Sequence, residues 1–150
     1  MENTSYVNPD NTAHRPDKVY GSVIDQIKKD GVCPFCPENL AKYHKNPILK
    51  EGQFWLLTNN AYPYEAAKYH ILMIHKKHIQ KFEEVSPDAW SELRSLIKDF
   101  TAEKNIPGGS LVMRFGNTAY TGATVSHLHA NLVSPPGEDK DRKPIIARIG

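Results

Sequence analysis

Apolar residues in this chain gather in short runs and helical stripes that are separated by turn-forming residues. The runs at 54–57, 69–75 and 110–115 have the length and composition of strands. In residues 126–133 polar and apolar side chains alternate instead, which is the pattern of a strand with one buried face. Leu128, Ala130 and Leu132 would face a core. His127, His129 and Asn131 would line the opposite face, where two imidazoles and an amide make a reactive surface.

Two stretches predict helices. In residues 17–29 apolar side chains recur at helical spacing, and Gly31 offers a stop. Residues 86–88, Ser-Pro-Asp, supply an N-cap hydroxyl, a proline at N1 and an acid in the first turn. The helix that they start carries one apolar stripe: Trp90, Leu93, Leu96, Ile97 and Phe100. Because the strands arrive in hairpin-like order around this helix, we predict an α+β fold with an antiparallel sheet.

The chain of 150 residues has the size of one domain. Residues 1–16 are rich in Asn, Asp, Thr and Pro and predict a flexible N-terminal arm, so we place a single domain at 17–150. After residues 135–137, Pro-Pro-Gly, the charged sequence predicts a flexible exit. No internal repeat and no second domain boundary is visible.

Composition narrows the function classes. The 39% hydrophobic and 24% charged residues are typical of a globular protein. The net charge of +2 is too balanced for a nucleic-acid polymer as partner, and the basic clusters at 76–77 and 140–143 are interpreted as solvated surface. No apolar run approaches the roughly 20 residues that span a bilayer, and the N-terminus lacks the apolar segment of a secretory signal. We therefore expect a cytoplasmic protein without a membrane partner.

Both cysteines lie in one tetrapeptide, Cys33-Pro-Phe-Cys36. In a reducing compartment this spacing leaves zinc binding, redox activity and buried thiols as alternatives. A thioredoxin-like interpretation needs a parallel βαβ unit, which the pattern lacks, so zinc is favoured. Two thiolates supply half of a tetrahedral site, and His78 and His127 are the candidates for the other half.

A glycine-containing loop at 116–124 precedes the histidine strand. Its backbone N–H groups, with Asn117 and Thr124, could grip phosphate oxygens, although the same residues also make ordinary turns. His70 and His75 are interpreted as hydrogen-bonded or solvent-facing residues at strand ends. His14 and His44 lie in polar segments and receive no role.

Taken together and in this order, these residues resemble the histidine triad (HIT) superfamily of nucleotide-binding hydrolases and transferases. The motif of that superfamily is His-φ-His-φ-His-φ-φ, where φ is apolar, and residues 127–133 read His-Leu-His-Ala-Asn-Leu-Val. The likeness also covers residues 122–126, 70–78, 60–63 and the cysteine pair. It implies an antiparallel sheet of about five strands flanked by helices and paired as a homodimer.

The resemblance also implies a mechanism. His129 would attack the α-phosphorus of a nucleotide and form a covalent nucleotidyl-histidine, which is then discharged to water or to an acceptor. A backbone carbonyl would hold the other ring nitrogen of His129 and so fix its tautomer. Thr124 and Asn117 match positions that contact phosphate oxygens, and Asn60 falls near the ribose-binding position.

Zinc-containing branches of the superfamily imply the metal ligands Cys33, Cys36, His78 and His127, with about one structural zinc per chain. The chain departs from the motif at Asn131, which stands where hydrolytic branches have the third histidine. An amide can donate a hydrogen bond to a phosphoryl oxygen but cannot shuttle a proton near neutral pH. We therefore hypothesise that Asn131 slows hydrolysis of the intermediate and favours transfer.

Three functions follow from these residues. The leading one is a hydrolase or nucleotidyltransferase that acts on a nucleoside phosphoramidate or a dinucleoside polyphosphate. The second is a catalytically weak nucleotide-binding or interaction module of the same fold, and the third is a purely structural zinc site. Phe54 and Trp55 could wall a purine pocket, with the hydrophobic core as the alternative for at least one of them.

Overall fold

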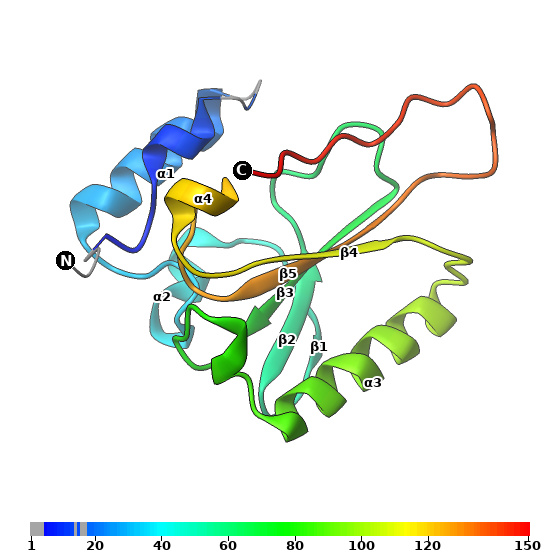
Figure 1. The fold of residues 1–150 in the computed structure, drawn as a ribbon, viewed down its shortest axis with the longest axis horizontal. Helices are drawn as coiled ribbons and strands as arrows, with labels where there is room; N and C mark the ends of the chain where they lie inside the picture. Colours follow the sequence, from blue (N-terminus) through cyan, green and yellow to red (C-terminus); the bar gives the residue numbers. More distant parts are fainter. Residues whose placement is uncertain (1–4, 14, 16–17) are drawn as a thin grey trace.

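The computed structural model of the protein describes residues 5–13, 15 and 18–150. One antiparallel sheet has the strand order β1-β2-β3-β5-β4 (Figure 1), which confirms the predicted α+β class. Its strands are β1 (Ile48–Glu51), β2 (Trp55–Asn59), β3 (Tyr69–His75), β4 (Ser110–Arg114) and β5 (His129–Ser134). The α-helices are α1 (Lys18–Asp30), α2 (Pro37–Tyr43), α3 (Pro87–Glu103) and α4 (Thr118–Thr121), with 3₁₀ turns η1 (Pro9–Thr12) and η2 (Phe82–Glu84). None of the described helices is long and apolar enough to cross a membrane.

One face of the sheet carries the main hydrophobic core, which α3 covers (Figure 1). Leu128, Ala130 and Leu132 are all buried there, as the alternation in the histidine strand predicts. Trp55 is 0% exposed in this core and its indole N–H donates to the Ala89 carbonyl (2.8 Å). Phe54 packs against the same core, so core packing is the role of both aromatic residues and neither walls a purine pocket.

Helix α3 starts at the predicted signals, because the Ser86 hydroxyl accepts a hydrogen bond from the backbone N–H of Ala89 (3.1 Å). Leu93 and Phe100 are buried, and Leu96 and Ile97 pack against the core. Trp90 does not follow the predicted stripe, since it is 39% exposed.

Three local elements differ from the sequence prediction. The polar stretch after the cysteine pair forms α2, which has proline in its first turn and buries Leu40. Strand β1 was not predicted, because it is a mostly exposed edge strand without alternation. The last strand begins at His129 rather than at residue 126, so His127 precedes the sheet ladder.

Part of the predicted flexible arm packs against the domain. Val7 is 3% exposed, forms a bridge with Val125, and shares a small core with Ile24 and Ile27 of α1. The Asn8 N–H donates to the Thr124 carbonyl (2.8 Å). A buried apolar side chain and hydrogen bonds from Asn8 and Asn11 thus anchor the segment. Residues 1–4, 14, 16 and 17, which include His14, lie outside the described residues.

A carboxylate ties α3 to the turn between β1 and β2. Glu92 accepts hydrogen bonds from the backbone N–H groups of Gln53 (2.6 Å), Phe54 (2.8 Å) and Trp55 (2.9 Å). A Cβ atom on Gly52 would lie 2.3 Å from the Glu92 carboxyl carbon, so the turn needs glycine to admit the carboxylate. Three charge-assisted bonds to one side chain make this contact a strong link between helix and sheet.

We expect a Glu92→Ala substitution to lower the free energy of unfolding by about 2–3 kcal/mol, because it leaves three backbone donors without their acceptor. Urea unfolding monitored by circular dichroism measures this. The matched control is Glu103→Ala in the same helix. Glu103 forms a surface ion pair with Lys50 (2.5 Å) and its side chain is 58% exposed, so we expect a loss below about 1 kcal/mol. Equal losses in the two variants would contradict the role of Glu92.

Candidate functional site

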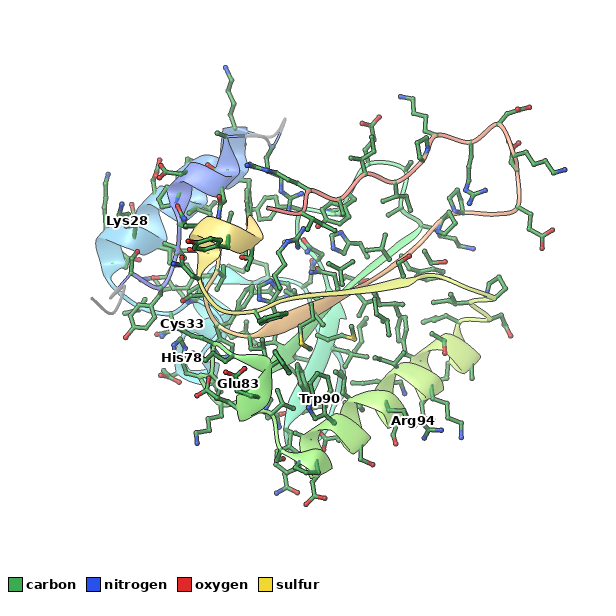
Figure 2. The ribbon with its side chains drawn as sticks, viewed as in Figure 1. Lys28, Cys33, His78, Glu83, Trp90 and Arg94 are labelled. Atoms are coloured by element: carbon green, nitrogen blue, oxygen red, sulfur yellow. The ribbon has the colours of Figure 1, made fainter. Side chains whose placement is uncertain are left out.

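The two cysteines and two of the histidines converge on one point, and Figure 2 shows Cys33 and His78 beside each other. Cys33 and Cys36 bracket the knuckle before α2, His78 follows β3, and His127 precedes β5. The four ligand atoms all lie within 4.8 Å of one another. His127 Nδ1 is 3.1 Å from His78 Nδ1 and 3.3 Å from Cys33 Sγ. The structure therefore brings together all four residues that the resemblance implied as ligands.

These donors fit a tetrahedral metal ion. Zinc takes thiolates at about 2.3 Å and imidazoles at about 2.0–2.1 Å, which places neighbouring donors about 3.3–3.8 Å apart. Cys36 Sγ lies 3.6 Å from His78 Nδ1 and 3.8 Å from His127 Nδ1. Burial raises the pKa of Cys33, and burial together with the neighbouring Cys33 raises the pKa of Cys36 to about 12. Both thiols would thus ionise only with a cation between them.

His127 connects the cluster to His129, because its ring faces the cluster and its backbone carbonyl bonds to His129. Its ring is 0% exposed, and its Nε2–H donates to the His75 carbonyl, which leaves Nδ1 to face the cluster. Its backbone carbonyl accepts a hydrogen bond from His129 Nδ1 (2.7 Å). Because a carbonyl can only accept, His129 carries its proton on Nδ1 and keeps a lone pair on Nε2.

The His129 ring is further held by the knuckle. Phe35, between the two cysteines, makes an edge-to-face contact with His129, with ring centroids 5.1 Å apart at 84°. Burial, with a smaller contribution from the positive charge of Arg114, lowers the pKa of His129 to about 4. His129 is therefore neutral at pH 7, as a nucleophilic imidazole requires.

The orientation of the Asn131 amide is set by His70. The Tyr64 N–H donates to His70 Nδ1 (2.9 Å), so the His70 proton sits on Nε2. That Nε2 donates to Asn131 Oδ1 (2.8 Å). Burial lowers the pKa of His70, which keeps the ring neutral. Because Oδ1 faces His70, the amide N–H group of Asn131 is left to donate to other partners.

His129 and Asn131 open into a cavity of about 690 Å³ on the sheet face opposite α3. Asn60 and Thr124 also line it, so the structure brings these two predicted phosphate- and ribose-contact residues to the nucleophile. Thr124 exchanges a hydrogen bond with the Tyr20 hydroxyl, and Asn60 Oδ1 accepts from the Tyr62 N–H (2.8 Å). His44, which received no role, lies in the cavity wall and is hydrogen-bonded to Thr58 (2.7 Å).

Asn117 does not line this cavity. It is the N-cap of α4, where its side-chain oxygen accepts the Ala119 N–H (2.9 Å). The sequence alone treats residues 116–124 as one loop, whereas the structure forms a short helix there and uses Asn117 as its cap.

The sequence analysis missed Arg114, the last residue of β4. Arg114 is the cross-strand partner of His129 and lines the same cavity. Its guanidinium donates to the carbonyls of Thr121 (3.1 Å) and Arg148 and to the Tyr64 hydroxyl (3.4 Å). These acceptors are all neutral, so among the described residues no carboxylate offsets the charge of Arg114. Arg114 is placed beside His129 by the register between β4 and β5, which the sequence alone does not give.

The chain belongs to the histidine triad (HIT) superfamily and to the family described as "Scavenger mRNA decapping enzyme C-term binding", whose family model matches residues 32–144. No curated protein matches the chain significantly.

Solved structures of HIT proteins share the fold. A HIT family hydrolase from Clostridium thermocellum is 28% identical, with 74% of this chain and 95% of that chain covered and a TM-score of 0.53. A histidine triad nucleotide-binding protein from Candida albicans is 23% identical (78% and 86% covered, TM-score 0.56). A Zn-bound histidine triad family protein from Mycobacterium smegmatis is 19% identical (72% and 78% covered, TM-score 0.55). The match and these neighbours confirm the HIT resemblance and the fold.

Proposed function

We propose that this protein is a nucleotide hydrolase or nucleotidyltransferase that works through a covalent nucleotidyl-histidine on His129. Its substrate is a nucleoside phosphoramidate or a dinucleoside polyphosphate. The observation that carries this proposal is the neutral His129 ring in a large cavity, with Nδ1 bound to the His127 carbonyl and Nε2 unprotonated. A similar solved structure is named a HIT family hydrolase, which favours the same class.

In the proposed reaction His129 Nε2 attacks the α-phosphorus in line with the leaving group. Asn131 N–H and the Thr124 hydroxyl donate to non-bridging phosphoryl oxygens, and Arg114 supplies positive charge on the same strand pair. Asn60 contacts the ribose. Water or an acceptor then attacks the phosphorus from the vacated side and releases His129.

We propose zinc as the ion of the cluster formed by Cys33, Cys36, His78 and His127. The two-sulfur, two-nitrogen donor set and its spacing support this choice, as does the Zn-bound HIT protein among the similar structures. The ion would hold the knuckle against the catalytic strand. All four ligand positions are filled by protein, so the role of the ion is structural.

The second candidate is a nucleotide-binding or interaction module with little turnover. Asn131 favours it, because an amide cannot act as a proton donor or base at this position. The unprotonated His129 nitrogen favours the enzyme instead, because a binding module has no need of a prepared nucleophile.

We further propose a homodimer. Strand β4 is an edge strand, and next to its unpaired backbone groups Leu111 is 58% exposed and Phe115 is 50% exposed. Pairing of two β4 edges would be isologous and would cover these side chains. Sedimentation equilibrium measures the mass; the mass of one chain at micromolar concentration would contradict this proposal.

We expect the purified protein to contain about one zinc per chain, which mass spectrometry of the metal content measures. Cys33→Ser should lose the metal, because one of the two thiolates is removed. The matched control is His129→Gln, which changes the neighbouring motif histidine and should retain zinc. A metal-free wild-type protein, or equal loss in both variants, would contradict the assignment.

We expect a nucleotide labelled in its α-phosphate to remain attached to the wild-type protein after alkaline quenching, since a phosphorus–nitrogen bond to histidine survives alkali but not acid. His129→Ala should show no adduct and should lower turnover at least about a thousandfold. Full turnover in His129→Ala would refute the enzymatic function.

We expect Asn131→His to raise the ratio of water product to acceptor product at least about tenfold, because it adds a group that can move a proton. Chromatography of products formed with inorganic phosphate as acceptor measures this ratio. Asn131→Gln, which retains an amide, is the control and should keep the wild-type ratio. An unchanged ratio in Asn131→His would show that residue 131 does not set the partition.

A further inference from the structure

A second cavity of about 590 Å³ adjoins the nucleophile cavity, and the two share Tyr64 and Pro144 in their walls. Strand register shows that they lie on one sheet face. The cross-strand pairs are Arg114 with His129, Val112 with Asn131, and Ser110 with Val133. Alternate residues of a strand face the same side, so the floor of the second cavity, made by Ser110, Val112 and Val133, continues the line that starts at His129.

The C-terminal segment covers this line. Residues 140–148 supply wall residues to both cavities and run beside the sheet on the side away from α3 (Figure 1). Lys140 and Arg142 line the second cavity, and none of the described residues lining it is acidic. The Arg142 guanidinium donates to a backbone carbonyl, that of Asp139 (2.9 Å), and forms no ion pair with a carboxylate of the described residues.

The first cavity has the same electrostatic character. Arg15, Arg114, Lys143 and Arg148 line it, against a single acid, Glu65, which pairs with Lys143 at 3.3 Å. Six basic side chains and the single acid Glu65 thus line one groove that runs from His129 past Tyr64 to Lys140 and Arg142.

The geometry points to a leaving-group subsite in the second cavity, which binds the phosphate-bearing half of a dinucleoside polyphosphate. This inference rests on the proposed function and chooses between its two substrate classes. The phosphorus under attack would lie at His129, the bridging phosphates would pass Arg114 and Tyr64, and the far nucleotide would reach Lys140 and Arg142.

The chemistry of bond breaking supports the same choice. When His129 Nε2 forms its bond to the α-phosphorus of a phosphoanhydride, the phosphorus–oxygen bond breaks and its electron pair stays on the departing oxygen. The leaving nucleotide gains one negative charge, which needs cations and no proton. The leaving nitrogen of an alkyl phosphoramidate must instead be protonated, and the amide of Asn131 cannot supply that proton.

The test compares wild type with a Lys140→Ala/Arg142→Ala double variant on diadenosine tetraphosphate and on the p-nitrophenyl ester of AMP, whose small leaving group also departs as an anion without a proton. We expect kcat/KM for the dinucleotide to fall at least about tenfold and kcat/KM for the ester to stay within about twofold. The matched control is Arg94→Ala/Lys98→Ala, which removes the same two residue types from exposed positions of α3, where Figure 2 shows Arg94. The control should match wild type on both substrates.

Calorimetric binding separates the subsite from the chemistry. A methylene-bridged diadenosine tetraphosphate should bind the double variant at least about tenfold more weakly than wild type, whereas AMP should bind both equally. Equal losses for the two ligands, or no loss for either, would overturn the subsite. If the binding difference holds and no substrate forms an adduct, the proposed reaction fails and the subsite stands.

Discussion

The site depends on the position of His127. This residue is fully buried, its ring faces the cysteine cluster through Nδ1, and its own carbonyl accepts the proton of His129 Nδ1. A shift of its backbone would therefore change both a metal ligand and the tautomer of the nucleophile. The strand ladder begins only at His129, so packing, the cluster and the ring hydrogen bond to the His75 carbonyl hold His127 in place. A metal ion held by the cluster would stabilise the nucleophile through this one residue.

The two faces of the sheet have different roles, one in stability and the other in the proposed chemistry. One face carries the apolar core under α3, and the carboxylate of Glu92 fixes that helix to the β1–β2 turn. The other face holds His129, Asn131 and Arg114 on two paired strands. Because alternate residues point to opposite faces, each strand can serve both purposes without conflict. The fold tolerates the polar side chains of residues 127–131 because three apolar side chains of the same segment are buried in the core on the opposite face.

Alternation and motif spacing made much of this predictable. The buried face of β5, the start of α3 and the four residues of the cluster all follow from local patterns or from the HIT resemblance. Arg114 and the role of residues 140–148 do not, because both depend on strand register and on where the chain returns after β5. A basic cluster in sequence looks the same whether it is solvated or lines a groove. The short helix that Asn117 caps was not predicted, because a single turn is too short to leave a periodic signal.

The hydrogen bond from His70 fixes the orientation of the Asn131 amide. Its oxygen accepts the hydrogen bond from His70, so its amide N–H group is left to donate to other partners, and an amide moves no proton. The groove beyond Tyr64 is cationic, and a substrate whose leaving group departs as an anion suits both features. Such a site would stabilise the transition state through preorganised geometry and positive charge, without a proton transfer from residue 131.

The most direct test of the account is the tautomer of His129 in the zinc-loaded protein, read from long-range proton–nitrogen NMR correlations of ¹⁵N-labelled histidine near pH 7. We expect a neutral ring protonated on Nδ1, with Nε2 unprotonated and available to phosphorus. A ring protonated on Nε2, or a fully protonated ring, would contradict the claim that the His127 carbonyl prepares His129 as the nucleophile.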